Sequence, residues 1–473
     1  MGKATGFMEY TRKNFTYRPA AERVKDFKEF TGLQPEKELQ KQGARCMDCG
    51  IPFCHSMGCP VYNLIPEWND LIYKGKWREA WQRLELTNNL PEVTGRICPA
   101  PCEASCTLSI NSAPVSIKQI ELAIIEKAFA SGWVVPMPPP FESGKRVAVI
   151  GSGPAGLAAA QQLRRQGHTV VVFERDSRIG GILRYGIPDF KLEKTVLDRR
   201  IEQMKAEGII FETNADIGED LSARYIRQKY DAILLTMGAG EPRDLPVAGR
   251  GLENIHFAME YLTKMNKYLT GELKEHEIIS AKGKKVLVIG GGDTGADCIG
   301  TANRQGAASV HQFEILPKPR TWNKTNNPEW PAWPNILRTG SSHEEGCERR
   351  WSVMTKQFTG RGVKVAKAHC MEVTWDRDPE SDRYKMKEVA GSDFSLDVDL
   401  VILAMGFLHV KHSKLLHDLG VTYDTRGNIK TDGNYATSVP GVFAAGDADI
   451  GASLIVRAIY HGRCAAEITS NTL

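Results

Sequence analysis

The chain has 473 residues, of which 42% are hydrophobic and 25% are charged, as in ordinary globular proteins. The net charge is only +4 and no dense run of lysine or arginine occurs, which argues against nucleic acid as a partner. The longest apolar runs are of strand length, well short of the roughly 20 residues of a membrane helix. The first residues also lack the apolar core of a secretory signal. We therefore expect a cytoplasmic protein of roughly three domains that neither spans nor binds a membrane.

The first 140 residues differ from the rest of the chain. The stretches 66–86 and 117–129 predict helices, and the proline-rich run VVPMPPP (134–140) predicts a linker. Seven of the eleven cysteines lie here, between Cys46 and Cys106. In a reducing compartment so dense a group indicates metal binding rather than disulfides. Residues 1–140 are thus predicted to form a mainly helical, metal-binding domain.

The cysteine spacing favours iron–sulfur clusters. The pattern is Cys46-x2-Cys49-x4-Cys54-x4-Cys59, followed by Cys98-x3-Cys102-x3-Cys106. Proline follows two of these cysteines, which is common beside cluster ligands. Seven thiolates almost complete two 4Fe–4S clusters, which together need eight ligands, whereas a zinc site would use four and leave three idle. The four scattered cysteines are interpreted as core or surface residues: Cys298, Cys347, Cys370 and Cys464.

Two copies of one strand–helix–strand pattern follow the linker, and each has a glycine turn after its first strand. The predicted elements are strand 146–150, helix 154–167 and strand 169–173, and then strand 285–289, a helix to 305 and strand 309–313. Such units build doubly wound α/β domains that bind dinucleotides. The predicted fold class is therefore α/β, with two dinucleotide-binding domains behind the helical one.

Each glycine in these turns has a predicted role. Gly151 permits the tight turn, Gly153 admits a pyrophosphate, and Gly156 lets helix and strand pack closely, while Glu174 binds a ribose. The second copy supplies the corresponding residues and two further expected nucleotide contacts at the start of its helix: Gly290, Gly292, Gly295 and Glu314, with Asp293 and Thr294.

The C-terminal stretch GVFAAGD (441–447) resembles the second FAD fingerprint of two-dinucleotide-binding flavoproteins, in which Gly446 and Asp447 would contact the flavin. LLTMGAG (234–240) and ILAMGF (402–407) resemble the crossover strands of that family. The resemblance implies that the first glycine loop binds FAD and the second binds NAD(P)H. The implied domains are 141–280 with 410–473 for FAD, and 281–409 for NAD(P)H. Hydride transfer from nicotinamide to flavin needs alignment rather than a side-chain acid or base, so we assign no catalytic residue.

The segments RCMDCGIPFCH, TGRICPAPCEASC and PVSIKQIE resemble the iron–sulfur domain of glutamate synthase small (β) subunits, a module also found in dihydropyrimidine dehydrogenase. GFMEYTRKNF near the start and HEEGCERRWSVMTKQF (343–358) resemble the small subunits in particular. The resemblance implies that two clusters interleave along the chain. One set of ligands would be Cys46, Cys49, Cys54 and Cys106, and the other Cys59, Cys98, Cys102 and Glu121. The alternative for Glu121 is an exposed carboxylate on an amphipathic helix.

The same resemblance places GGILRYGIPDFKL (180–192), with Gly181, along the flavin, and Arg457 stands where relatives carry an aromatic residue. It implies an electron-input subunit that oxidises NAD(P)H at FAD and passes electrons through two 4Fe–4S clusters. The acceptor would be a large subunit that forms glutamate from glutamine and 2-oxoglutarate. The alternatives are the input subunit of a bifurcating ferredoxin:NADP oxidoreductase, and a zinc-stabilised NAD(P)-sensing module.

The nucleotide preference depends on the residue at the end of strand 309–313. A carboxylate at Glu314 accepts hydrogen bonds from both ribose hydroxyls and repels a 2′-phosphate, which favours NADH. Against this, three basic side chains are close enough in the sequence to turn toward a phosphate: Arg304, Lys318 and Arg320. We expect NADH to be preferred.

Overall fold

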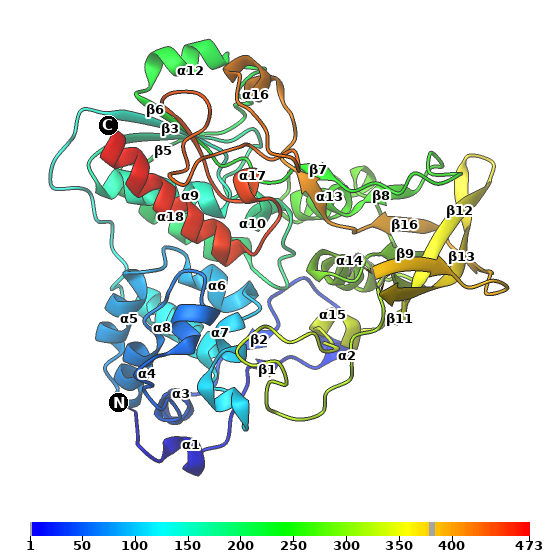
Figure 1. The fold of residues 1–473 in the computed structure, drawn as a ribbon, viewed down its shortest axis with the longest axis horizontal. Coiled ribbons are helices and arrows are strands. Elements are labelled where there is room, and N and C mark those ends of the chain that lie inside the picture. Colours follow the sequence, from blue (N-terminus) through cyan, green and yellow to red (C-terminus); the bar gives the residue numbers. More distant parts are fainter. Residues whose placement is uncertain (1, 378–383) are drawn as a thin grey trace.

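Helices make up most of the first 130 residues, which we call the helical unit (Figure 1, blue to cyan). The computed structural model describes residues 2–377 and 384–473. The helices are α1 (Gly6–Glu9), α2 (Ala20–Arg23), α3 (Glu36–Ala44), α4 (Ile65–Tyr73), α5 (Trp77–Glu85), α6 (Pro91–Ile97), α7 (Pro101–Ala104) and α8 (Ile117–Ala130). A π-helix (Cys54–Gly58), a 3-10 helix (Thr107–Ile110) and the paired strands β1 (Thr16–Tyr17) and β2 (Thr31–Gly32) complete the unit.

The stretch 66–86, predicted to be helical, contains two helices. Gly75 has a φ of +73°, a left-handed conformation that ends α4 and lets α5 start two residues later. In the described residues 2–377 and 384–473, no helix is both long and apolar enough to cross a membrane.

The first α/β unit contains a five-stranded parallel sheet in the order β18-β6-β3-β4-β5. Its strands are β3 (Arg146–Ile150), β4 (Thr169–Phe173), β5 (Ile210–Glu212), β6 (Ala232–Leu235) and β18 (Val442–Ala444). One face packs on α9 (Pro154–Arg165), α11 (Lys194–Ala206) and α18 (Ile455–Thr472), and the other on α12 (Ala223–Lys229) and α16 (Lys414–Leu419). Alternate residues of β3 enter the two cores, which explains its unbroken apolar run.

The second α/β unit has the strand order β11-β10-β9-β16-β8, again all parallel. Its strands are β8 (Ile255–Phe257), β9 (Lys285–Ile289), β10 (Ser309–Glu314), β11 (Glu348–Trp351) and β16 (Leu400–Leu403). Helices α13 (Ala258–Leu269) and α14 (Asp293–Arg304) cover one face. The other face packs against an antiparallel layer of β12 (Val353–Arg361), β13 (Lys364–Arg377) and β15 (Phe394–Asp397), which β14 (Tyr384–Glu388) extends. The doubly wound α/β fold class is confirmed.

The second unit is inserted in the first, and the two crossings pair with each other. The outgoing strand β7 (Glu241–Pro242) lies antiparallel to the returning strand β17 (Phe407–His409). The predicted boundary at 280/281 differs from this arrangement, because β8 and α13 precede it and yet β8 hydrogen-bonds to β16 of the second sheet. The insertion therefore begins at β7. The crossover segment 234–240 identified in the sequence ends directly before β7, whereas the predicted boundary was placed near the second glycine loop, about one strand and one helix further on.

Candidate functional site

The three glycines of the first loop differ in what surrounds them. Gly151 has a φ of +101°, and a Cβ added to it would lie 2.7 Å from the carbonyl oxygen of Thr236. A Cβ on Gly156 would lie 2.0 Å from the carbonyl oxygen of Gly151. Gly153 has an ordinary φ of −67°, and an added Cβ would meet no atom within 4 Å. The chain itself does not require glycine at 153, so the open space at the start of α9 fits a ligand phosphate.

The second loop repeats this arrangement. Gly290 has a φ of +121° and its added Cβ would lie 2.2 Å from the carbonyl oxygen of Ala404. A Cβ on Gly295 would lie 2.5 Å from the carbonyl oxygen of Gly290, whereas one on Gly292 would meet nothing within 4 Å. Asp293 and Thr294 form the first turn of α14 directly after this open position. Both loops thus leave room for a phosphate at a helix N-terminus.

The acidic residue of each copy is bound to its own glycine loop. Glu174 Oε2 accepts hydrogen bonds from the backbone N (3.2 Å) and Oγ (2.5 Å) of Ser152. Glu314 Oε2 accepts from the backbone N of Gly291 (2.6 Å), and Oε1 from that of Leu316 (3.1 Å). These bonds hold each carboxylate at the carboxyl end of its strand, where a nucleotide ribose lies in such folds.

The C-terminal segment closes around the first loop. A Cβ on Gly446 would lie 2.9 Å from Ala155 Cβ, and one on Gly181 would lie 2.9 Å from Gly153 Cα. Asp447 begins the short helix α17 (Asp447–Ile450) and accepts a hydrogen bond from Ser453 Oγ at 2.7 Å. Residues from three distant parts of the chain therefore meet at one loop. Arg457, in the first turn of α18, is exposed.

The seven clustered cysteines and Glu121 line two separate cavities of the helical unit. The first cavity is lined by Cys46, Cys49, Cys54 and Cys106, with apolar neighbours such as Met47 and Ile65. The second is lined by Cys59, Cys98, Cys102 and Glu121, with Asn63, Lys118 and Val456 among its neighbours. Within the described ranges, no three Cys, His, Asp or Glu side chains are arranged to bind a single metal ion. The thiols stand around spaces instead, an arrangement that fits a polynuclear cluster better than a zinc ion.

The environment of the thiols also fits a cationic metal group. Burial raises the pKa of Cys46 to about 11 and those of Cys59 and Cys98 to about 12, so the free thiols would be protonated at neutral pH. Coordination to iron would remove these protons, because a coordinating thiol is deprotonated. Backbone N–H groups already point at two sulfurs, from Asn63 to Cys59 Sγ at 3.5 Å and from Ala100 to Cys98 Sγ at 3.4 Å. Such donors stabilise metal-bound thiolates.

Glu121 is buried on α8, with 5% of its surface exposed, so the alternative of an exposed carboxylate was wrong. Its Oε1 accepts hydrogen bonds from Thr94 Oγ1 (2.5 Å) and Asn88 Nδ2 (3.1 Å). Burial raises the pKa of Glu121 to about 7. A buried carboxylate of this kind is stabilised by a cationic ligand in the adjoining cavity.

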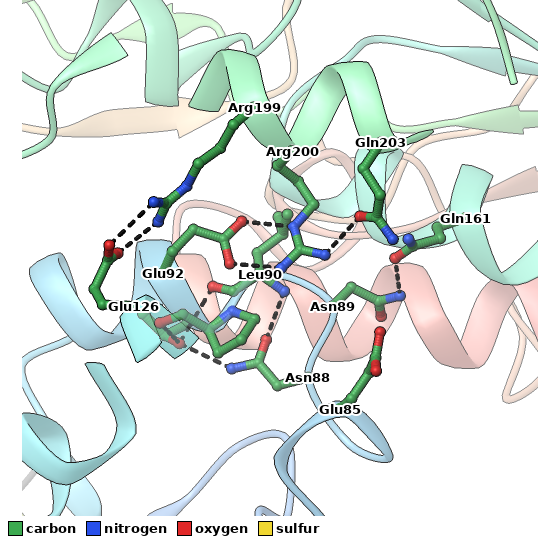
Figure 2. Close-up of polar contacts among 12 residues, drawn as sticks. Glu85, Asn88, Asn89, Leu90, Glu92, Glu126, Gln161, Arg199, Arg200 and Gln203 are labelled. Carbon is green, nitrogen blue, oxygen red and sulfur yellow. Dashed lines mark hydrogen bonds and ion pairs between the residues drawn. The ribbon is translucent and has the colours of Figure 1, made fainter. Parts of the chain in front are cut away.

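A buried polar network joins the helical unit to the first α/β unit (Figure 2). Arg200 on α11 binds both carboxylate oxygens of Glu92 on α6, at 2.7 and 2.8 Å, and both residues are almost fully buried. Asn89 Nδ2 donates to Gln161 Oε1 of α9 at 2.6 Å. These contacts hold the cavities in place beside the helix that begins at the first glycine loop.

Several residues of the site were not predicted from the sequence. Val456 on α18 lines the second cavity, and Asn88 orients Glu121, but neither belongs to a recognisable motif. Arg304 was considered for a phosphate, and this was wrong. Its guanidinium is fully buried, forms an ion pair with Glu345 and lies 3.7 Å from the centre of the Phe190 ring. The other two basic residues are exposed; Lys318 lies over Trp351 and Arg320 pairs with Glu329.

Comparison with known proteins gives matches over the whole chain. Residues 145–462 match the family described as pyridine nucleotide-disulphide oxidoreductase, and residues 23–133 match dihydropyrimidine dehydrogenase domain II, 4Fe-4S cluster. The glutamate synthase (NADPH) small chain of Mycobacterium tuberculosis is 53% identical over 98% of this chain and 95% of its own length. Glutamate synthase (NADH) of Schizosaccharomyces pombe is 48% identical over 99% of this chain, which spans 23% of that protein. Mycobacterium tuberculosis FprA in complex with NADPH shares the fold, with a TM-score of 0.54 at 17% identity over 70% of this chain and 84% of its own.

Proposed function

This chain belongs to the family of glutamate synthase small chains and is an NAD(P)H-dependent flavin oxidoreductase, and we propose that it brings electrons from NAD(P)H to a large subunit through FAD and two 4Fe–4S clusters. The large subunit would use them to form L-glutamate from glutamine and 2-oxoglutarate. The observation that carries this proposal is the division of eight ligand-type residues into two cavities of four. Eight is the number that two such clusters need.

The ligand sets follow the cavities. We assign one cluster to Cys46, Cys49, Cys54 and Cys106, and the other to Cys59, Cys98, Cys102 and Glu121. Carboxylate ligation by Glu121 is supported by its burial and by the two hydrogen bonds that converge on Oε1.

The two glycine loops are assigned to FAD and NAD(P)H. For FAD we propose the first loop with Glu174, Gly181, Gly446 and Asp447, since these meet around Gly153. For NAD(P)H we propose Gly290, Gly292, Asp293, Thr294, Gly295 and Glu314. Bound FAD supplies the ability to accept a hydride and release its electrons singly. The chain would position the two ring systems, and the transfer between them needs no side-chain acid or base.

The second cavity is the one that adjoins the flavin unit. Val456 lines this cavity and lies in the first turn of α18, nine residues after Asp447 of the FAD fingerprint. We therefore propose that electrons enter at the second cavity and pass from there to the first.

We propose NADH as the preferred donor, on the ground that Glu314 stands at the ribose position and that Arg304 is withdrawn into an ion pair. The names of the relatives divide on this point, since the mycobacterial protein is named for NADPH and the fission-yeast protein for NADH.

The first prediction is the metal content, because eight ligands imply about eight iron atoms and one FAD per chain. Anaerobically purified protein should be brown and should reduce a one-electron dye with NAD(P)H on its own. Mixed with a glutamate synthase large subunit, it should support glutamate formation. Stoichiometric zinc without iron would reject the clusters, and reduction of ferredoxin without glutamate formation would favour the bifurcating alternative.

A further inference from the structure

The connection between β10 and β11 leaves the second α/β unit and reaches the helical unit. In Figure 1 it extends as a yellow-green loop from the region of α15 (Ser341–Glu344) toward α7. Its residues 326–331, here called the strap, contact the helical unit around Ala104 to Ile110. The connection starts directly after Glu314, the carboxylate assigned to the nucleotide ribose.

Asn327 is the centre of the strap and is 7% exposed. Its backbone N donates to the carbonyl oxygen of Ser109 at 2.6 Å, and its Nδ2 donates to that of Ala104 at 2.9 Å. Within the connection, Nδ2 also donates to the carbonyl oxygen of Ala332, and Oδ1 accepts from the backbone N of Glu329. One side chain therefore orders the strap and binds it to the helical unit.

Trp330 makes the second set of contacts. Its Nε1 donates to the carbonyl oxygen of Ser105 at 3.2 Å, and its ring centre lies 4.8 Å from that of Phe53. Ser105 Oγ in turn donates to the carbonyl oxygen of Pro331 at 2.8 Å. Phe53 directly precedes Cys54, a residue of the first cavity.

The segment that the strap contacts lies between residues of the two ligand sets. Ala104 and Ser105 lie between Cys102, which lines the second cavity, and Cys106, which lines the first. The π-helix packs closely against the other side of this segment, because a Cβ on Gly58 would lie 2.6 Å from Cys102 Cα. A shift of this segment therefore moves one residue of each cavity together.

We propose that the strap is a positioning element for the clusters, in which Asn327 and Trp330 of the NAD(P)H-binding unit hold the 102–106 loop and so fix one ligand of each cluster. This rests on the proposed assignment of the cysteines as cluster ligands. It assigns to the second α/β unit a role beyond nucleotide binding, since the unit also sets the geometry of both electron carriers. Residues that orient metal ligands in this way change the properties of the metal without contacting it.

The test is Asn327→Asp in the full, cluster-loaded chain. Aspartate has nearly the same volume and can still accept from Glu329, but it places a negative oxygen against the carbonyls of Ala104 and Ala332. Asn323→Asp is the matched control, since it makes the same charge change at an exposed position of the same connection. In Asn327→Asp the electron paramagnetic resonance signals of both reduced clusters should change, and a chelator should remove iron about 10-fold faster. FAD content and dye reduction should match the control.

The proposal is overturned if the signals and the rate of iron loss in Asn327→Asp equal those of Asn323→Asp. If Asn327→Asp does not retain FAD, Trp330→Phe replaces it, because this variant keeps a ring on Phe53 and loses only the hydrogen bond to Ser105. Unchanged signals in Trp330→Phe would then overturn the proposal. A wild-type protein without iron would instead refute the proposed function.

Discussion

At the scale of single residues, the two glycine loops show that identical residues can be required for different reasons. Gly151 and Gly156 are required by the chain, through a left-handed φ and through close backbone contact respectively. Gly153 is required by neither, since an added Cβ would lie in open space. A ligand is the physical reason that remains for glycine at this position.

A valine at position 153 should therefore expel FAD without unfolding the protein. Its side chain would occupy the approach of the pyrophosphate, while the backbone φ of −67° suits any residue. Gly433→Val is the control, because this glycine also has open space around its added Cβ and is not one of the loop residues 151–156. Flavin absorbance after gel filtration gives the measurement, and a Gly153→Val protein that stays fully yellow would show that the first loop does not bind FAD.

Glu314 gives the second prediction at this scale. Its carboxylate is bound to the glycine loop by the backbone N of Gly291, so it is fixed where an adenosine ribose would lie. Glu314→Ala should lower the specificity constant for NADH about 10-fold or more, corresponding to about 1.4 kcal/mol, and affect NADPH less. Steady-state dye reduction with both nucleotides measures this. A wild-type preference for NADPH would contradict the proposed donor, and an unchanged ratio in the variant would contradict the role of Glu314.

At the scale of elements, the packing of α18 on α9 connects the C-terminus to the first glycine loop. Gly462 is the contact point, because a Cβ there would lie 2.2 Å from the carbonyl oxygen of Ala155. Ala155 belongs to the first turn of α9 and also contacts Gly446. The position of the FAD fingerprint therefore depends on one close helix–helix approach.

Valine at 462 should push α18 away from α9. Overpacking of this kind typically costs about 1–3 kcal/mol, and here it also displaces Gly446 from the loop. Glu467→Val is the control, since it places the same β-branched side chain on the exposed face of the same helix. The thermal unfolding midpoint and the affinity for FAD should both fall in Gly462→Val only. Equal midpoints for the two variants would show that the helices can separate without cost.

The sequence predicted the elements with local signatures and missed those without. Strands β3, β4 and β9 have the bounds predicted for them, because buried parallel strands have a composition of their own. Strand β8 is three residues long and precedes its glycine loop, so its sheet could not be assigned. Asn327 reaches Ala104 across 223 residues, and no local pattern encodes such a contact.

At the scale of the whole molecule, buried ion pairs hold the three units together. Arg200 and Glu92 join the helical unit to the first α/β unit, with 3% and 0% of their side chains exposed. Arg23 of the helical unit and Arg304 of the second α/β unit share the carboxylate of Glu345. Removing one partner of such a pair leaves a buried charge without compensation.

Arg200→Met should consequently destabilise the protein by about 3–5 kcal/mol, because Glu92 remains buried and unpaired. The double variant Glu92→Leu/Arg200→Met should recover most of this loss, since it removes both charges. Thermal unfolding of the wild type, both single variants and the double variant gives the coupling between the two residues. A double variant as unstable as Arg200→Met would show that the packing of the arginine stem matters more than its charge.

Two neighbouring asparagines in the loop between α5 and α6 bind to opposite sides of the boundary between the helical unit and the first α/β unit (Figure 2). Asn88 donates to Glu121 at the second cavity, while Asn89 donates to Gln161 on α9, the helix that begins at the first glycine loop. Both are buried, so this loop lacks the tolerance of a surface connection for added or lost residues. An insertion of a single residue would displace both asparagines from their hydrogen-bond partners and so disturb both proposed cofactor sites at once. Natural variation in the length of the chain should therefore fall elsewhere, and this short loop should keep its length wherever the two sites occur together.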